Sequence, residues 1–233
     1  MEKIDIGIIG AMDSEVQMLK SRLDGSCEIT VGGITFFRGK LLGKEVAIAR
    51  CGIGKVFAAM CAEAMIITFS PKVIINTGVG GALKKGISIG DIVIAEKLVQ
   101  HDMDTSALGD PKGLISGINR VYFDSYAKGV ELLKRAAEEE GLSVKLGIIA
   151  SGDRFVADSA MKEQIVREFD ASVCEMEGAS IAHVAFVNQT PVLVIRAVSD
   201  SADEGSSMDY MEFLPIAADR SARLTMAFCK SFS

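Results

Sequence analysis

Residues 192–198 of this 233-residue chain read VLVIRAV, and residues 73–77 read VIINT. The leading runs at 73–75 and 192–195 are continuously apolar, without the alternation of a strand that faces water on one side. Such runs are typical of strands buried on both faces, as in a sheet that lies between helices. We therefore expect one α/β domain, residues 1–233, with a central mixed β-sheet.

Away from these runs, short apolar segments alternate with longer amphipathic ones. The pattern predicts strands at 4–10, 27–31, 34–40, 45–50, 73–77, 91–99, 143–150, 172–175 and 191–198. It predicts helices at 14–23, 54–69, 125–140, 159–169, 178–186 and 214–228, with Pro215 in the first turn of the last helix. Residues 101–119 are expected to form a long irregular connection.

Composition narrows the class of protein. With 49% apolar residues, 24% charged residues and four prolines, the chain can bury a sizeable core. The net charge of −6 argues against a nucleic-acid partner, which would need a basic surface. No segment approaches the roughly 18 uncharged apolar residues of a membrane span, so no membrane association is expected. A small-molecule substrate is the favoured partner.

The five cysteines are scattered and contain no C-x-x-C pair, so they indicate neither a zinc site nor a disulfide framework. The N-terminal stretch lacks the basic start and cleavage pattern of a signal peptide. Both observations favour the cytoplasm. The His, Cys and carboxylate residues show no convincing ligand spacing, so neither a metal nor an organic cofactor is implied.

Acidic residues follow three of the predicted strands, at Glu15, Glu177 and Asp200. Ligands of open α/β sheets gather at the carboxyl ends of strands, so this position is informative. Each acid also has a simpler interpretation. Glu15 lies where a helix dipole favours a carboxylate, although Asp13 or Ser14 suffices as the cap and leaves Glu15 free for another task.

The other two acids leave similar alternatives open. Glu177 is separated from Glu175 by one residue, so strand geometry would project both carboxylates to one face, where a sugar diol is a suitable partner. The simpler interpretation is a strand that ends in solvent. Asp200 either caps a turn or is a partly desolvated acid with a raised pKa that can donate a proton.

Two glycine-rich segments either approach a ligand closely or form tight turns. Residues 76–82, NTGVGGA, do not match a dinucleotide fingerprint, because the G-x-G-x-x-G frame fails at Leu83. Residues 52–55, GIGK, do not form a phosphate-binding P-loop, because Val56 stands where Ser or Thr is needed and Ala49 where the first Gly belongs.

Taken in order, these segments resemble the nucleosidase branch of the nucleoside phosphorylase/hydrolase superfamily, and most of all its 5′-methylthioadenosine/S-adenosylhomocysteine nucleosidases. The match runs nearly end to end. The segments that carry it are residues 6–12 (IGIIGAM) with Glu15-Val16, 52–56 (GIGKV), 75–78 (INTG), 90–93 (GDIV), 151–153 (SGD) with Phe155, 175–177 (EME) with residues 181–183 (IAH), and 196–200 (RAVSD).

The resemblance implies a three-layer αβα sandwich, a homodimer and hydrolysis of the N-glycosidic bond of an adenine nucleoside. Glu15 would activate water, and Asp200 would protonate N7 of adenine. Substrate would be bound by Glu177 and Met176 at the ribose hydroxyls, by Phe155 stacked on the base, by the backbone of Val156, and by Ile53, Gly81 and Ser199.

Cleavage of an N-glycosidic bond requires acidic and basic groups of this kind. Cleavage of C1′–N9 generates an oxocarbenium-like sugar and an adenine anion, so an acid belongs on the base side and an activated water on the opposite face. Related phosphorylases carry an Arg in the first glycine loop and Arg-x-Gly-Ser at the second, and this chain has neither. We expect hydrolysis of methylthioadenosine and S-adenosylhomocysteine. The alternatives are another nucleosidase, such as a futalosine hydrolase, and a purine nucleoside phosphorylase.

The chain departs from the family pattern at Val79, Ala82 and Leu108. Relatives commonly have T-G-S-A-G-G at residues 77–82 and a Phe in place of Leu108, which in relatives reaches across the dimer to the 5′ pocket. These departures leave the preferred 5′ substituent open. His101 and His183 are expected to be structural.

Overall fold

The computed structural model describes residues 3–232. Strands in this range are β1 (Ile6–Gly10), β2 (Asp24–Val31), β3 (Ile34–Leu41), β4 (Lys44–Arg50), β5 (Val73–Ala82), β6 (Ile92–Gln100), β7 (Tyr122–Asp124), β8 (Val144–Ser151), β9 (Val173–Glu175) and β10 (Val192–Asp200). The helices are α1 (Asp13–Lys20), α2 (Lys55–Phe69), α3 (Ala127–Glu139), α4 (Ser159–Phe169), α5 (Gly178–Val187) and α6 (Ser206–Ser231), with a 3₁₀ turn at Ser106–Leu108.

All of these strands join one mixed sheet. Its order is β10-β6-β8-β9-β5-β1-β4-β3-β2, with β7 on β6, and β10 also pairs in parallel with β5. The strands β5, β10, β6, β8 and β9 therefore form a closed ring, and β1 to β4 extend it on one side. The expected mixed sheet is confirmed.

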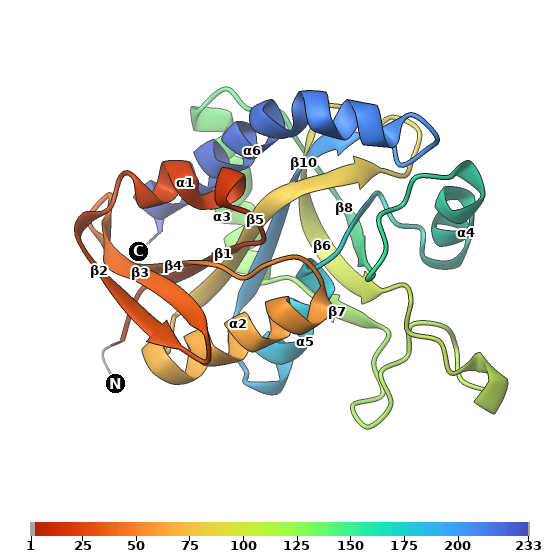
Figure 1. The fold of residues 1–233 in the computed structure, drawn as a ribbon, viewed down its shortest axis with the longest axis horizontal. Helices are drawn as coiled ribbons and strands as arrows, with labels where there is room; N and C mark the ends of the chain where they lie inside the picture. Colours follow the sequence, from red (N-terminus) through yellow and green to blue (C-terminus); the bar gives the residue numbers. More distant parts are fainter. Residues whose placement is uncertain (1–2, 233) are drawn as a thin grey trace.

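Helices cover both faces of this sheet (Figure 1). Helices α1, α3 and α6 pack on one face, and α2 packs against α5 on the other. The strands between them are buried along their whole length in β1, β5 and β10. Two apolar clusters, one on each face, contain most of the buried core, as expected for strands without alternation. No helix within residues 3–232 is both long enough and apolar enough to cross a membrane.

The glycine-rich segment at 76–82 is strand rather than the tight turn considered above. Strand β5 continues to Ala82, and Gly78, Gly80 and Gly81 have no left-handed backbone. Glycine is needed there for close approach. A Cβ on Gly78 would collide with the Glu15 carboxylate, and one on Gly81 would lie 2.7 Å from Asp200 Oδ1.

Two further elements differ from expectation. Helix α6 begins at Ser206 instead of residue 214, so Pro215 lies inside the helix and not in its first turn. The extension was missed because a proline normally marks a helix start, and its first turns expose Met208 and Met211 with no clear apolar stripe. The short strand β7 was not predicted, because three residues are too few for a pattern.

Candidate active site

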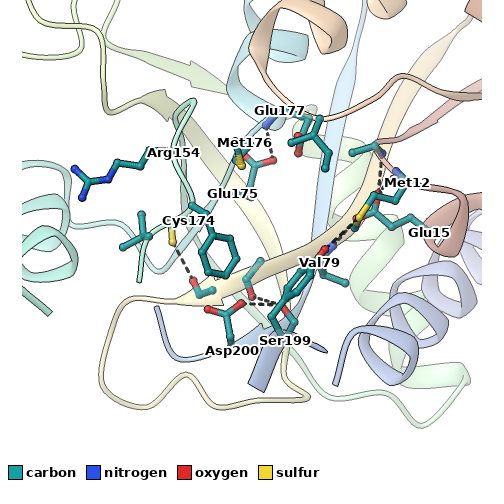
Figure 2. A pocket seen from close by; sticks show the side chains of 17 residues that line it. Met12, Glu15, Val79, Arg154, Cys174, Glu175, Met176, Glu177, Ser199 and Asp200 are labelled. Carbon is teal, nitrogen blue, oxygen red and sulfur yellow. Dashed lines mark hydrogen bonds between the residues drawn. The ribbon is translucent and has the colours of Figure 1, made fainter. Parts of the chain in front are cut away.

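A cavity of about 280 Å³ opens where β1, β5 and β10 end. It brings together all nine site residues expected from the sequence: Glu15, Ile53, Gly81, Phe155, Val156, Met176, Glu177, Ser199 and Asp200. Figure 2 shows Glu15 beside Met12, Asp200 beside Ser199, and Glu177 above Glu175 around this space. The same wall includes eight residues that were not among the expected site residues: Ala11, Met12, Val79, Gly80, Arg154, Cys174, Glu175 and Tyr210.

Glu15 lies at the start of α1 and is 4% exposed. Its Oε2 accepts hydrogen bonds from the backbone N–H of Ala11 at 2.7 Å and Met12 at 2.9 Å, and Oε1 accepts one from Val79 N–H at 3.0 Å. The expectation that Glu15 has no capping role is therefore wrong, because its carboxylate satisfies backbone donors before the helix. The N-cap residue is Met12, so neither Asp13 nor Ser14 occupies that position.

Burial is the largest influence on Glu15 and raises its pKa, while the Arg196 guanidinium and the three backbone donors act to lower it. The carboxylate thus combines a raised proton affinity with an orientation fixed by N–H groups from two segments. These are the properties of a positioned general base.

Glu175 is paired with the fully buried Arg196. An Arg196 N–H donates to a Glu175 carboxylate oxygen, and the same nitrogen donates to Asn76 Oδ1 at 2.5 Å. Ser151 Oγ–H and the backbone N–H groups of Glu177 and Gly178 also donate to this carboxylate. Glu175 is therefore the counterion of Arg196 inside the protein, where an unpaired charge would be costly.

Glu177 is held by a different set of groups. Its Oε1 accepts a hydrogen bond from Gly54 N–H at 2.9 Å, at the start of α2, and its Oε2 lies 3.9 Å from Arg196 Nη2. Burial and the neighbouring Glu175 raise the pKa of this carboxyl, and Arg196 opposes the shift. Within the described part of the chain one hydrogen bond shorter than 3 Å occupies the carboxylate, which leaves it able to bind hydroxyl groups in the cavity.

Asp200 ends β10 and is 2% exposed. Ser199 Oγ–H donates to Oδ2 at 2.9 Å, and Ala202 N–H donates to Oδ1 at 2.9 Å. Burial raises the pKa of Asp200 more strongly than these hydrogen bonds lower it. A raised pKa is the change that a carboxyl group needs in order to act as a general acid.

The remaining wall is apolar and more open. Ile53 is 55% exposed and Phe155 is 43% exposed. The Tyr210 ring of α6 packs edge-on against Phe155, with ring centroids 5.6 Å apart, and its hydroxyl lies 3.1 Å from Met12 Sδ. A flat aromatic ligand can stack on such a wall.

The two histidines lie outside the cavity wall. His101 is buried, and its ring lies against the backbone of Gly152. His183 stacks on Phe123, with ring centroids 5.2 Å apart, and its Nδ1 lies 3.3 Å from Gln100 Nε2. Burial lowers the pKa of both rings, which favours neutral packing groups.

Two residues that shape the site had no expected role: Arg196, which pairs with the cavity residue Glu175, and Tyr210, which packs against Phe155. Arg196 interrupts the apolar run at 192–198, and a charge inside a strand buried on both faces signals a buried partner. The position of Arg196 in the sequence could therefore have predicted a buried acidic partner. No sequence signal indicated that Tyr210 belongs to the site, because the start of α6 was not predicted.

Known proteins match this chain over nearly its whole length. Residues 5–230 match the family model of the phosphorylase superfamily. The 5′-methylthioadenosine/S-adenosylhomocysteine nucleosidase of Haemophilus influenzae (strain PittGG) is 40% identical over 222 residues, 95% of this chain and 96% of that protein. The aminodeoxyfutalosine nucleosidase of Helicobacter pylori (strain J99) is 39% identical, over 94% of this chain and 95% of that protein.

Among solved structures, the fold is similar to that of the 5′-methylthioadenosine/S-adenosylhomocysteine nucleosidase of Neisseria meningitidis in complex with methylthio-immucillin-A. The TM-score is 0.94 and the sequences are 38% identical, with 97% of this chain and 99% of that chain covered. With a matching family model, closely similar full-length relatives and this common fold, the chain belongs to the phosphorylase superfamily.

Proposed function

We propose that this chain is an N-glycosyl hydrolase that cleaves 5′-methylthioadenosine and S-adenosylhomocysteine to adenine and the corresponding thioribose. The observation that carries the proposal is the placement of Glu15, Glu177 and Asp200 around one cavity. Full-length relatives named 5′-methylthioadenosine/S-adenosylhomocysteine nucleosidases support the choice of substrates.

Asp200 acts on the base side. The adenine ring stacks on Phe155, and the Asp200 carboxyl donates its proton to N7 as the C1′–N9 bond breaks. Burial raises the pKa of Asp200, which favours its protonated form. The hydrogen bonds from Ser199 Oγ and Ala202 N to the carboxyl oxygens fix its direction before substrate arrives.

Glu15 acts on the opposite face of the sugar. Its carboxylate accepts a proton from the water that attacks C1′, and Glu177 binds the 2′ and 3′ hydroxyls. A carboxylate at the diol also places negative charge near the oxocarbenium-like transition state. The positive charge of Arg196 offsets part of the repulsion between the acidic groups, and it opposes the rise that burial causes in the pKa of Glu15 and Glu177.

Water, rather than phosphate, fits this wall. The guanidinium of Arg196 is already bonded to Glu175, and that of Arg154 lies 3.3 Å from Asp158. A phosphate placed near C1′ would meet the carboxylates of Glu15 and Glu177. Two like charges in a poorly solvated cavity repel strongly, so phosphorolysis is disfavoured.

The test is a product analysis. The purified chain is incubated with methylthioadenosine, S-adenosylhomocysteine, aminodeoxyfutalosine and inosine, with and without phosphate, and the released base and sugar are identified. We expect adenine from the first two substrates in phosphate-free buffer. A strict requirement for phosphate would contradict hydrolysis. Exclusive cleavage of aminodeoxyfutalosine would favour a second candidate function, that of an aminodeoxyfutalosine nucleosidase. The similarity to the Helicobacter pylori enzyme of that name supports this candidate.

We also propose that the chain acts as a homodimer in the cytoplasm. Large apolar side chains are exposed on the adjacent helices α2 and α5, namely Val56, Phe57, Met60, Phe186 and Val187. A patch of this kind beside the cavity residue Ile53 is suited to a second copy. Light scattering should give twice the 24.8 kDa mass of one chain.

The free thiols of all five cysteines support a reducing compartment, which cell fractionation would test.

A further inference from the structure

The start of α2 receives carboxylate groups from two other segments of the chain. Gly54 N–H donates to Glu177 Oε1 at 2.9 Å, and the next N–H, that of Lys55, donates to Asp153 Oδ1 at 2.7 Å. The first turn of this helix, residues 55–58, contains no acidic residue, and its N-cap, Gly54, has no side chain that could accept a hydrogen bond. Asp153 therefore supplies from a distant loop the acceptor that an N-cap side chain normally provides.

Gly54 adopts a backbone conformation that other groups have to hold in place. Its φ of 100° and ψ of 161° lie in a region open almost only to glycine, and an unrestrained glycine has many other conformations available. A Cβ on Gly54 would lie 3.1 Å from Asp153 Oδ1, so the turn and this carboxylate are in close contact. The direction of Gly54 N–H thus depends on the groups that fix the turn, and Asp153 is one of them.

Asp153 is itself fixed by a third segment. Its backbone N–H donates to Asp102 Oδ2 at 2.9 Å, and Asp102 Oδ1 lies 2.5 Å from the Lys55 ammonium. The side chains of Lys55 and Asp102 are 19% and 30% exposed, so this ion pair is partly shielded from water. Asp102, Asp153 and Lys55 therefore form a closed cycle of contacts. The cycle joins the segment after β6, the loop between β8 and α4, and the first turn of α2.

Resting on the nucleosidase function proposed above, we propose that Asp153 is a positioning residue for recognition of the ribose. Asp153 lies outside the cavity wall, and it acts on Glu177 through the backbone of Gly54. With the turn held, Gly54 N–H orients one oxygen of the Glu177 carboxylate and leaves the other for the diol. No bond is made or broken at Asp153, so its effect belongs to the affinity for the ribose hydroxyls.

The test measures the preference for methylthioadenosine over its 3′-deoxy analogue, which lacks one hydroxyl of the diol. Dissociation constants are measured by calorimetry in the Asp200→Asn background, where turnover is slowed, with and without Asp153→Ala. We expect the preference to fall by about two- to tenfold, because groups in one hydrogen-bond network are coupled. An unchanged or larger preference would overturn the proposal, even if both ligands bound more weakly. A displaced Phe155, two residues along the chain, would weaken both ligands alike.

Two further variants make the result specific. Asp153→Asn keeps a side-chain oxygen that can accept from Lys55 N–H, so it should recover most of the preference lost in Asp153→Ala. No recovery would contradict a role through that hydrogen bond.

Asp5→Ala is the matched control. Asp5 also accepts a hydrogen bond from a distant backbone N–H, that of Glu45 at 3.0 Å, and pairs with a lysine, Lys72, at 2.8 Å. All three residues lie outside the cavity wall, so the preference should stay unaltered. An equal fall in this control would assign the effect to a general loss of stability and contradict the proposal.

The proposed function is tested separately by adenine release from methylthioadenosine with the unaltered chain. If no adenine is released while Asp153→Ala still lowers the binding preference, the hydrolase proposal fails and the positioning proposal stands. If adenine is released but Asp153→Ala leaves the preference intact, only the positioning proposal fails.

Discussion

The two parts of the cavity wall are built in different ways. Glu15 and Asp200 are 4% and 2% exposed, and backbone N–H groups or a neighbouring hydroxyl fix their carboxyl oxygens. Ile53 and Phe155 are 55% and 43% exposed, and each comes from a loop before a helix. The carboxyl groups proposed to react are thus oriented in advance, whereas the surface proposed to contact the base is more exposed.

This difference separates catalysis from recognition. A carboxyl group whose hydrogen bonds already exist does not have to reorganise during the reaction, so its contribution is large and specific to the transition state. Apolar contacts contribute similarly to the ground state and the transition state, so changes there should alter affinity more than turnover.

The largest effects should come from the buried carboxyl groups. Asp200→Asn cannot protonate N7, and Glu15→Gln cannot accept a proton from water, while both keep the size of the side chain. We expect kcat to fall by roughly 10²–10⁴-fold for each variant, with little change in KM. Steady-state kinetics with methylthioadenosine measure this. Near-normal kcat in either variant would remove that residue from its role.

A backbone substitution can displace a catalytic carboxylate without touching it. A Cβ on Gly78 would collide with the Glu15 carboxylate, so Gly78→Ala should lower kcat by about 10²-fold through misplacement of the base. Gly205→Ala is the matched control, because a Cβ there meets its nearest atom at 3.6 Å. Equal losses in the two variants would argue against the close approach at Gly78.

On the open side of the cavity, Phe155→Ala removes the aromatic surface assigned to adenine. Stacking on one base is worth about 1–3 kcal/mol, so KM should rise by roughly 10-fold or more while kcat falls less. Phe155→Leu should recover part of the lost affinity through its remaining apolar area. If kcat fell more than KM rose, the separation between the two parts of the wall would be wrong.

The smallest effect concerns stability. The folded-state pKa of Asp200 is raised by burial, so its charged form destabilises the fold as pH increases from the usual value of 3.8 through the raised pKa. Asp200→Asn should therefore raise Tm at pH 8 by roughly 2–4 °C, as expected for about 1 kcal/mol in a chain of this size. The gain should shrink towards pH 4. Thermal melts at the two pH values test it, and a lower Tm at pH 8 would contradict the burial cost.

The core could be predicted from the sequence more fully than the site. The apolar runs at 73–75 and 192–195 predict the buried strands of a mixed sheet, because a two-sided core leaves a pattern in the chain. The family resemblance supplied the nine residues that the structure brings together. Contacts between residues far apart in the sequence leave no local pattern. Examples are the ion pair of Arg196 with Glu175 and the hydrogen bond from Val79 N–H to Glu15. They depend on which strands become neighbours.

The glycines of β5 show the same limit. A local pattern of glycines permits either a turn or a close approach, and only the position of Glu15 and Asp200 decides between them. Tyr210 became visible as a cavity residue because α6 extends eight residues before the predicted start, through a proline that usually marks a helix boundary.

The central claim is that water, activated at Glu15, attacks C1′ while Asp200 protonates the base. The most direct measurement is a single turnover of methylthioadenosine in ¹⁸O-labelled water without phosphate, with mass spectrometry of both products. Incorporation of one ¹⁸O into the methylthioribose and none into adenine is the predicted result, and Glu15→Gln should slow it. Release that requires phosphate and yields a sugar phosphate would contradict the account.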